Sequence, residues 1–167
     1  MTRTNIRYRP TTEDDEAFLR DMQYEALFVP EGMPLFPKSI LDEPSIRKYY
    51  MNWGHGDLDI GFIALKGPKK IGAAWARIFP EENSGFGFVD EQTPEFSIAV
   101  IADYRAQGVG SNLLKKLEQA CREQQVTRLS LSVDHRNPAR HFYSRRGYKL
   151  FTKNHPAHIL VKKLAPT

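Results

Sequence analysis

The clearest chemical signal is a turn that holds an arginine and two glycines between an apolar segment and a long amphipathic one. Arg105, Gly108 and Gly110 follow the apolar residues 96–101. A helix that begins where a strand ends can bind an anion, because the N–H groups of its first turn lack intrahelical partners and lie at the positive end of the helix dipole. Glycine also removes the Cβ atom that would keep a phosphate from the backbone. We therefore predict a phosphate site at residues 105–111, although the same glycines also suit a plain strand-to-helix turn.

A second segment with chemical potential is NPARHFYSRRGY, residues 137–148, which follows another predicted strand. Asn137 before Pro138 predicts a helix start, because asparagine caps first-turn N–H groups and proline fits the first helical position. Tyr143 lies inside this helix. On the helix face with Ala139 and Phe142, its ring can simply pack in the core.

Together the two segments resemble the signature blocks of the GNAT superfamily of acyl-CoA-dependent N-acetyltransferases. The matching patterns are R-x-x-G-x-G at residues 105–110 and N-P-A-x-x-x-Y at residues 137–143. Residues 6–18, IRYRPTTEDDEAF, also resemble the usual opening of that family, and the order of elements is similar along nearly the whole chain. The sequence departs from the family at Gln107, where a basic or small residue is common, and at Tyr148, where phenylalanine is more common.

The resemblance implies that acetyl-CoA lies in a gap beside the central strand. The pantetheine arm would pair with the backbone of Ile98, Ala99 and Val100, and the N–H of Val100 would polarise the thioester carbonyl. The turn would bind the pyrophosphate through its amides, with Arg105 adding charge; its members are Arg105, Ala106, Gln107, Gly108, Val109, Gly110 and Ser111. Asn137 would contact the pantetheine arm, cap the helix, or do both. Tyr143 would protonate the departing CoA thiolate.

The sequence gives no decisive base for the attacking amine. Glu95 is the first candidate, acting directly or through water. An acidic loop could attract a cationic acceptor, although such acids more often simply face solvent; its members are Glu81, Glu82, Asp90 and Glu91. We expect the acceptor between residues 29–39 and 79–94. Phe28, Phe36 and Trp75 are the candidate lining residues, and packing explains each of them equally well.

These observations predict an N-acetyltransferase that transfers acetyl from acetyl-CoA to a primary amine by direct attack in a ternary complex. The alternative is a non-catalytic acyl-CoA-binding regulatory module. Cys121 is expected to be a buried thiol rather than an acyl relay. The histidines show no ligand spacing, so we expect no metal site.

Length, composition and net charge limit the possible number of domains, the charge of the ligand and the location of the protein. The 167 residues, 41% of them hydrophobic, suit one domain over residues 1–167. The net charge of +4 and the pI near 9.2 favour an anionic ligand, and only this basic balance speaks for nucleic acid. The sequence has one cysteine, and it lacks an apolar leader and a run of about 18 apolar residues. We therefore predict a cytoplasmic protein without membrane contact. We expect a small-molecule or protein amine as the partner and no nucleic acid, and leave a homodimer open.

The elements that must position these residues follow from hydrophobic periodicity. The pattern predicts an α/β fold of the α+β type, with a mixed, mostly antiparallel sheet of six or seven strands and about four helices. A capping pair, Thr11 with Asp14 or Thr12 with Asp15, is expected at the first helix. Residues 29–39 should form a packed loop that buries Met33, Leu35 and Phe36. Strands are predicted at 6–9, 60–65, 71–78, 96–101, 129–133, 148–151 and 158–164, and helices at 11–28, 45–53, from 110 onward and at 138–146.

Overall fold

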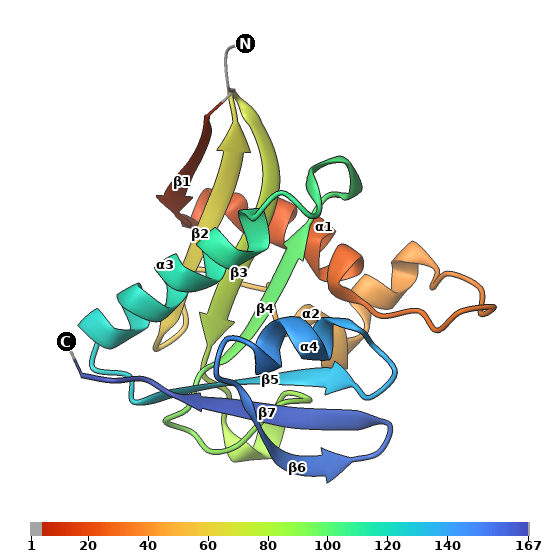
Figure 1. Ribbon diagram of the computed structural model, residues 1–167, viewed down its shortest axis with the longest axis vertical. Helices are drawn as coiled ribbons and strands as arrows, with labels where there is room; N and C mark the ends of the chain where they lie inside the picture. Colours follow the sequence, from red (N-terminus) through yellow and green to blue (C-terminus); the bar gives the residue numbers. More distant parts are fainter. Residues whose placement is uncertain (1–4, 167) are drawn as a thin grey trace.

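The protein is built on one seven-stranded sheet, seen in a computed structural model that describes residues 5–166 (Figure 1). The strand order is β1-β2-β3-β4-β5-β7-β6. Within the described residues only β4 and β5 pair in parallel, and the other neighbours are antiparallel. The strands are β1 (Ile6–Pro10), β2 (Asp59–Lys66), β3 (Lys69–Arg77), β4 (Glu95–Val100), β5 (Arg128–Asp134), β6 (Lys149–Asn154) and β7 (Ala157–Lys163).

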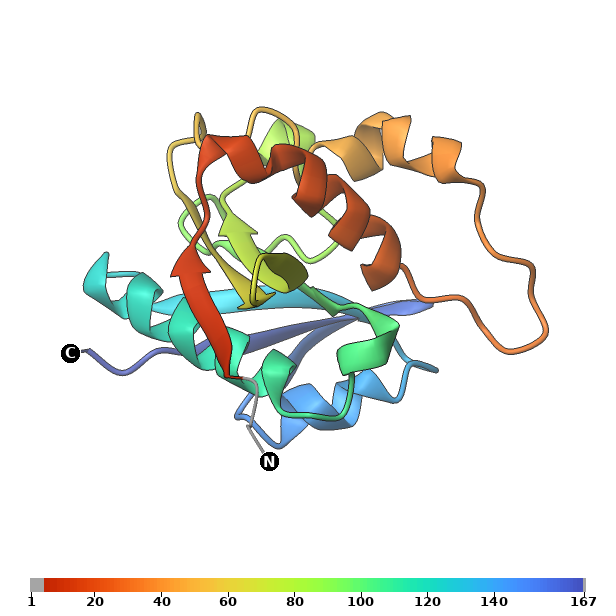
Figure 2. The same ribbon diagram turned by 90° about the horizontal axis from the view of Figure 1, so that it is seen from above.

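Helices cover both faces of the sheet (Figure 2). On one side lie α1 and α2, and on the other lie α3 and α4. The four α-helices are α1 (Glu16–Ala26), α2 (Pro44–Arg47), α3 (Val109–Glu123) and α4 (Ala139–Ser144). The predicted mixed, mostly antiparallel sheet with about four helices is therefore confirmed. A single domain over residues 1–167 stays a prediction, because residues 1–4 and 167 lie outside the described part.

Two hydrophobic cores hold these layers together. On the α3 side, the helix buries one stripe against the middle strands, and the small side chains of Ala74 and Ala76 on β3 let it come close. On the α1 side, Leu19 and Met22 pack against Trp75 of β3. The stripe of α3 consists of Leu113, Leu114, Leu117 and Cys121.

Three predicted helix boundaries need correction. The first helix starts with a 3-10 turn at Glu13–Asp15, and α1 ends at Ala26 rather than Phe28. Of the two capping pairs, Thr12 with Asp15 forms, with the Thr12 N–H donating to Asp15 Oδ2 at 2.8 Å. The helix predicted at 138–146 is α4, which is shorter. The helix predicted at 45–53 is wrong beyond Arg47.

The segment after α2 is a series of turns because its backbone leaves the helical region. Asn52 has a φ of 56° and Gly54 a φ of 94°, and both values are incompatible with a right-handed helix. The carbonyls that a helix would have used are bound elsewhere, since Arg77 Nη1 donates to the carbonyls of Lys48 and Met51 at 2.8 Å each. The apolar spacing in this segment therefore reflects packing of a turn, not a helical face.

The prediction of a packed loop at residues 29–39 is wrong for its large side chains. Met33, Leu35 and Phe36 are 61%, 75% and 38% exposed. The loop projects away from the rest of the molecule, between α1 and α2 (Figure 2). One tie holds its far end, where the hydroxyl of Tyr24 donates to the carbonyl of Phe36 at 2.6 Å.

The feature that matters most for the site is the divergence of β4 from β5. Their pairing is limited to Glu95 opposite Ser130, with the Ser130 N–H donating to the carbonyl of Pro94 at 3.0 Å. Beyond that point the two strands separate, as their different directions in Figure 1 show. The sheet is therefore split between β4 and β5 everywhere beyond the first residue of β4.

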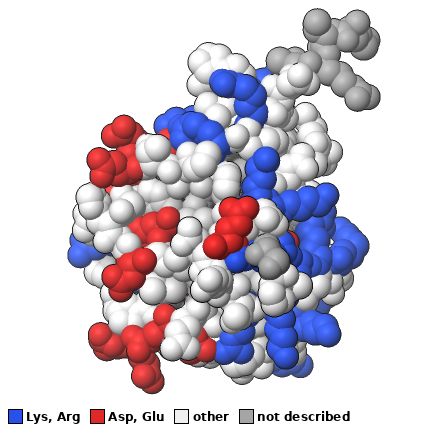
Figure 3. Space-filling model, turned by 90° about the vertical axis from the view of Figure 1, so that its left-hand side faces the viewer, with Lys and Arg blue, Asp and Glu red and all other residues white. Residues whose placement is uncertain are grey.

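Charge is distributed unevenly over the surface. Figure 3 shows acidic and basic side chains gathered on separate parts of one face, so this face carries both signs. Within residues 5–166, no helix is both long and apolar enough to cross a bilayer. The same residues contain no group of three or more His, Cys, Asp and Glu side chains arranged to bind a metal ion.

Candidate active site

The backbone of β4 directs hydrogen-bonding groups into the gap beside β5. β4 pairs with β3 in one register over Glu95–Val100, and the next N–H, that of Ile101, donates to the carbonyl of Ile71 at 2.9 Å. In an antiparallel ladder, residues that bond toward the partner alternate with residues whose N–H and C=O point away from it. Ile98 and Val100 are therefore the residues whose backbone groups face the gap.

Of the three residues predicted to pair with a pantetheine arm, Ile98 has both its N–H and its C=O free to do so, and Val100 has only its N–H free. Ala99 lies between them in the ladder, so its N–H and C=O bond toward β3, opposite Ala73. Ala99 still lines the space beside the gap. The carbonyl of Val100 accepts a hydrogen bond from Arg105 Nε at 2.8 Å.

Three adjoining cavities follow the gap from the turn before α3 to the interior. The turn cavity, of about 390 Å³, lies at residues 104–111 and shares Val100, Gly110 and Phe142 with the next one. The middle cavity, of about 590 Å³, lies between the end of α1, β4 and α4. The inner cavity, of about 180 Å³, shares Ile98 and Tyr143 with the middle cavity and extends between β4 and β5. Together they form a continuous path that fits a long, narrow ligand.

The turn cavity has the properties expected of a phosphate site. The first intrahelical bond of α3 runs from Asn112 N to the carbonyl of Gly108 at 3.1 Å, so the preceding N–H groups of the helix have no intrahelical partner. Those groups belong to Val109, Gly110 and Ser111, all of which line the cavity. Free amides at the positive end of a 15-residue helix attract an anion.

The two glycines of the turn act in different ways. Gly108 has a φ of 82°, in the left-handed region that side chains with a Cβ rarely adopt, and a Cβ there would meet no atom within 4 Å. It is needed for its conformation, and it faces open space. A Cβ at Gly110 would come within ordinary contact of Phe142 and Ile98, at 3.8 and 3.9 Å. Because Gly110 has a hydrogen in place of a Cβ, the space between Ile98 of β4 and Phe142 of α4 stays open at this point.

Of the side chains predicted for this site, Arg105 is already engaged. Besides its bond to Val100, its Nη2 lies 3.1 Å from Glu25 Oε2. Arg105 and Ala106 line the turn cavity, whereas Gln107 does not, and the Gln107 side-chain amide donates to the carbonyl of Asp103 at 3.2 Å. Arg146 also lines the cavity and was missed by the sequence analysis. Its position shortly after Tyr143 was the available signal.

The middle cavity brings together residues predicted for two different contacts. It is lined by Asn137, predicted to contact the pantetheine arm, and by Phe28, predicted to line the acceptor site. Asn137 also caps α4, since its Oδ1 accepts the N–H of Ala139 at 2.9 Å. This cap orients the helix so that Tyr143 faces the junction with the inner cavity.

The inner cavity contains a buried carboxyl group with a shifted pKa. Glu95 is 4% exposed, and its burial raises its pKa to about 7. The hydroxyl of Tyr49 donates to Glu95 Oε2 at 2.6 Å and in turn accepts the N–H of Phe86 at 2.7 Å. Glu95 Oε1 is buried without a hydrogen-bond partner among residues 5–166. A carboxyl group with a pKa near neutrality is suited to proton transfer.

Two glycines of the loop before β4 lie close to this carboxyl group. A Cβ at Gly85 would lie 2.1 Å from Glu95 Oε1, whereas a Cβ at Gly87 would first meet the β5 backbone of Leu131 and Ser132 at 2.7 Å and then Glu95 Cδ at 3.1 Å. Larger residues at Gly85 would therefore displace the carboxyl or the Tyr49 hydroxyl, which lies 2.7 Å from the same point. Tyr49, Gly85 and Gly87 were not among the predicted site residues.

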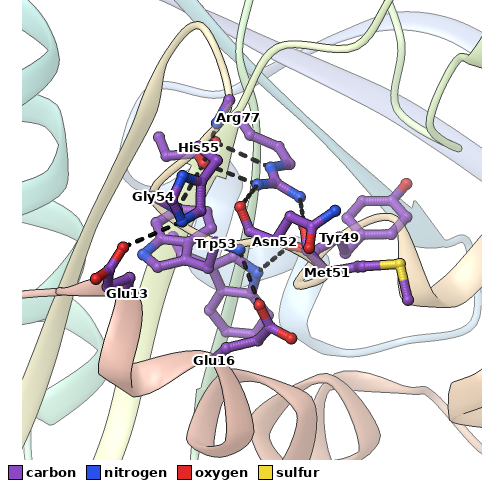
Figure 4. A network of polar contacts seen from close by, with 12 residues as sticks. Glu13, Glu16, Tyr49, Met51, Asn52, Trp53, Gly54, His55 and Arg77 are labelled. Atoms are coloured by element: carbon purple, nitrogen blue, oxygen red, sulfur yellow. Dashed lines mark hydrogen bonds and ion pairs between the residues drawn. The ribbon is translucent and has the colours of Figure 1, made fainter.

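Tyr49 is held in place by a polar network on the far side of its turn (Figure 4). Arg77 donates from Nε and Nη2 to Asp59 at 2.9 and 2.8 Å, and from Nη1 to the carbonyls of Lys48 and Met51. Trp75 Nε1 donates to the Tyr49 carbonyl at 3.0 Å. The turn is thus fixed on β3, next to the strand that carries Glu95.

Tyr143 lies on α4 with its ring against Phe96 of β4, at a centroid distance of 5.9 Å. Burial alone raises its pKa above the usual range, so the hydroxyl stays protonated at physiological pH. Tyr143 of α4 and Glu95 of β4 line the same inner cavity. A protonated hydroxyl group and a carboxyl group with a pKa near neutrality therefore face one space.

Two of the three predicted lining residues lie outside the cavities. Trp75 is 1% exposed and packs in the α1-side core, and Phe36 lies on the projecting loop. The alternative of simple packing thus accounts for Trp75. Phe28 lines both the middle and inner cavities, and Phe86 is the residue of the 79–94 loop that lines the inner one. Of the predicted loop 29–39, Val29 lines the middle cavity, and the described residues 30–39 line none of the three cavities.

Cys121 is completely buried in the α3-side core, away from the cavities. Burial, with a smaller effect of nearby Glu118, raises the pKa of its thiol to about 12. It has neither the access nor the ionisation that an acyl relay needs.

Comparisons with known proteins agree with this geometry. Residues 19–148 match the model of the acetyltransferase (GNAT) family. Among solved structures, PaiA N-acetyltransferase from Thermoplasma acidophilum, crystallised with coenzyme A, is 18% identical with a TM-score of 0.70, covering 95% of this chain and 99% of its own. The ribosomal-protein-S18-alanine N-acetyltransferase from Escherichia coli is 17% identical with a TM-score of 0.66, covering 98% and 96%.

A third similar structure is the GNAT domain of S. lividans PAT, with 18% identity and a TM-score of 0.67, covering 95% of this chain and 90% of its own. No match was found among curated protein sequences. The structural matches show the fold, and the family model matches well over half of the sequence. The chain therefore belongs to the GNAT acetyltransferase family.

Proposed function

We propose that the protein is an N-acetyltransferase that transfers the acetyl group of acetyl-CoA to a primary amine by direct attack. The observation that carries this proposal is the split between β4 and β5, where the free N–H and C=O of Ile98 and the free N–H of Val100 face the cavities. Glu95 and Tyr143 line its inner end. A module that only bound acyl-CoA would need the split but not a buried base facing an acid.

The residues present fit acetyl-CoA. The free amides of Val109, Gly110 and Ser111, with Arg146 nearby, suit a pyrophosphate. Arg105 joins them once it exchanges Glu25 for the more strongly charged phosphate. The free backbone groups of Ile98 and Val100 suit the amides of a pantetheine arm, which pairs like an added strand.

The chemistry divides among a small number of groups. Acetyl-CoA supplies an acetyl group as a thioester, and the acceptor nitrogen bonds to its carbonyl carbon as the carbon–sulfur bond breaks. Glu95 takes the proton from the amine, and Tyr143 gives its proton to the sulfur. The dry surroundings that raise the pKa of Tyr143 also disfavour a free thiolate, which keeps the transfer feasible.

The amide that polarises the thioester carbonyl must lie near both proton-transfer groups. Val100 was the residue implied by the sequence, but the inner cavity is lined by Ile98 and not by Val100. We therefore assign the carbonyl contact to the N–H of Ile98 and the arm contact to Val100. The assignment thus moves from Val100 to Ile98, the preceding residue of β4 whose backbone faces the gap.

The turn assignment can be tested with two matched glycine variants. Gly108→Val should weaken CoA binding at least tenfold, because a β-branched residue is strained at a φ of 82° and distorts the first turn of α3. Gly67→Val places the same residue at a φ of 58° in the β2–β3 turn, also in open space. It should lose stability to a similar degree and keep CoA affinity. Equal CoA affinity in the two variants, measured by calorimetry, would argue against the phosphate site.

The role of Glu95 gives a pH dependence. Because its pKa is raised to about 7, the carboxylate form needed for proton abstraction is lost as the pH falls through that value. With saturating acceptor, kcat should fall about tenfold per pH unit below pH 7, and Glu95→Gln should lower kcat by roughly 10²–10⁴ and lack this inflection. Glu118→Gln changes another buried glutamate, outside the cavities, and should keep the inflection. Persistence of the inflection in Glu95→Gln would exclude Glu95 as the base.

The role of Tyr143 is tested by removing its hydroxyl. Tyr143→Phe should lower kcat by roughly 10²–10⁴ and leave CoA affinity within about twofold, because the proton donor is lost but the packing stays. Tyr148→Phe is the matched control, a neighbouring buried tyrosine whose hydroxyl bonds to Glu118 at 2.9 Å. Thiol release measured with a panel of amines reports kcat. An unchanged kcat in Tyr143→Phe would remove it as the acid.

A further inference from the structure

The inner cavity contains a second buried oxygen without a partner. Gln23 of α1 is 6% exposed, lines the cavity with Glu95, and its Oε1 has no hydrogen-bond partner among residues 5–166. Leaving a buried acceptor unpaired costs free energy, because the group loses its hydrogen bonds to water and gains none from the protein. In the described chain, the only two such side-chain oxygens belong to Gln23 and Glu95. Their presence in one cavity indicates a ligand that brings two donors.

The charge of the cavity wall restricts that ligand further. None of the described residues that line the inner cavity is lysine or arginine, and its carboxyl groups are those of Glu95 and Asp134. Asp134 is paired with Arg136 at 2.8 Å, and this contact holds its pKa well below the usual range, so it stays negative. A carboxylate on the acceptor would therefore be repelled and would find no cation to bind.

The size and surface of the cavity favour a short aliphatic chain. Its volume of about 180 Å³ is below the roughly 300–1,000 Å³ of cavities that hold drug-sized ligands. The wall has mixed character, and Leu27, Ile46 and Phe86 are among its apolar residues. Methylene groups can pack against these side chains without displacing a hydrogen bond.

From these three observations we propose that the acceptor is a short, unbranched primary amine that carries a second N–H or O–H donor and no carboxylate. The reacting amine lies at Glu95, and the second donor binds Gln23. This inference rests on the proposed function and specifies its substrate class. Gln23 is a specificity residue that bonds to the acceptor and takes no part in proton transfer.

Three commercially available amines that differ by one group test the proposal. Putrescine carries two amines, pentylamine replaces one of them by a methyl group, and ornithine adds a carboxylate. With acetyl-CoA saturating, kcat/KM for putrescine should exceed that for pentylamine at least tenfold, because the unpaired Gln23 oxygen penalises the methyl group. Ornithine should be poorer still. Equal rates for putrescine and pentylamine, or a preference for ornithine or for a peptide N-terminus, would overturn the proposal.

Binding measured by calorimetry on the protein saturated with CoA separates this inference from the proposed function. Putrescine that binds at least tenfold more tightly than pentylamine, without any turnover, would support the cavity specificity and count against the enzyme. Turnover without such a preference would overturn the specificity alone. Both experiments use the unaltered protein, so they do not depend on the folding of a variant.

A substitution then locates the second contact. Gln23→Met keeps the length of the side chain and removes its amide, so the ratio of kcat/KM for putrescine to that for pentylamine should fall to near one. Gln119→Met makes the same change on the exposed face of α3, where Gln119 bonds to Glu123 at 3.1 Å. It should keep the ratio of the unaltered protein. An unchanged ratio in Gln23→Met would contradict the assignment.

Discussion

The structure depends on a break in hydrogen bonding at the centre of its sheet. Strands in the middle of a sheet normally pair on both sides, because an unpaired buried N–H or C=O costs free energy. Here β4 pairs fully with β3 and only at Glu95 with β5. The one-sided pairing is enough to hold β4 straight, and it leaves the groups of Ile98 and Val100 for a ligand. A fully paired sheet would be more stable and would have no cavity.

The rest of the fold keeps this gap open and places reactive groups along it. α3 starts where β4 ends, so its unpaired amides lie at the outer end of the gap. α4 starts at the cap provided by Asn137 and carries Tyr143 to the inner end. Arg77 and Trp75 of β3 fix the turn that carries Tyr49, which bonds to Glu95. Burial raises the pKa of Glu95 and of Tyr143, the two groups that we propose transfer protons.

Features of the fold that depend only on residues near each other in the sequence could be predicted from the sequence pattern. The apolar run of β4, the glycine at a positive φ before α3 and the Asn137 cap all depend on neighbours in sequence, and the family resemblance joined them into one site. The missing pieces depend on contacts between distant segments. Tyr49 lies 46 positions from Glu95, and its spacing resembled an apolar helix face. Gln23 gave no signal within α1, and Trp75 was considered for the site although it belongs to the core. Large side chains on the loop after α1 were expected to be buried, but the loop projects away from the sheet.

The most direct measurement of the central claim is a crystal structure of the protein with coenzyme A. The account predicts that the pyrophosphate lies against the N–H groups of Val109, Gly110 and Ser111. It also predicts that the pantetheine arm is hydrogen-bonded to the backbone of Ile98 and Val100 in the gap between β4 and β5. A coenzyme bound elsewhere, or a β4 and β5 that close into a continuous ladder when it binds, would contradict the account.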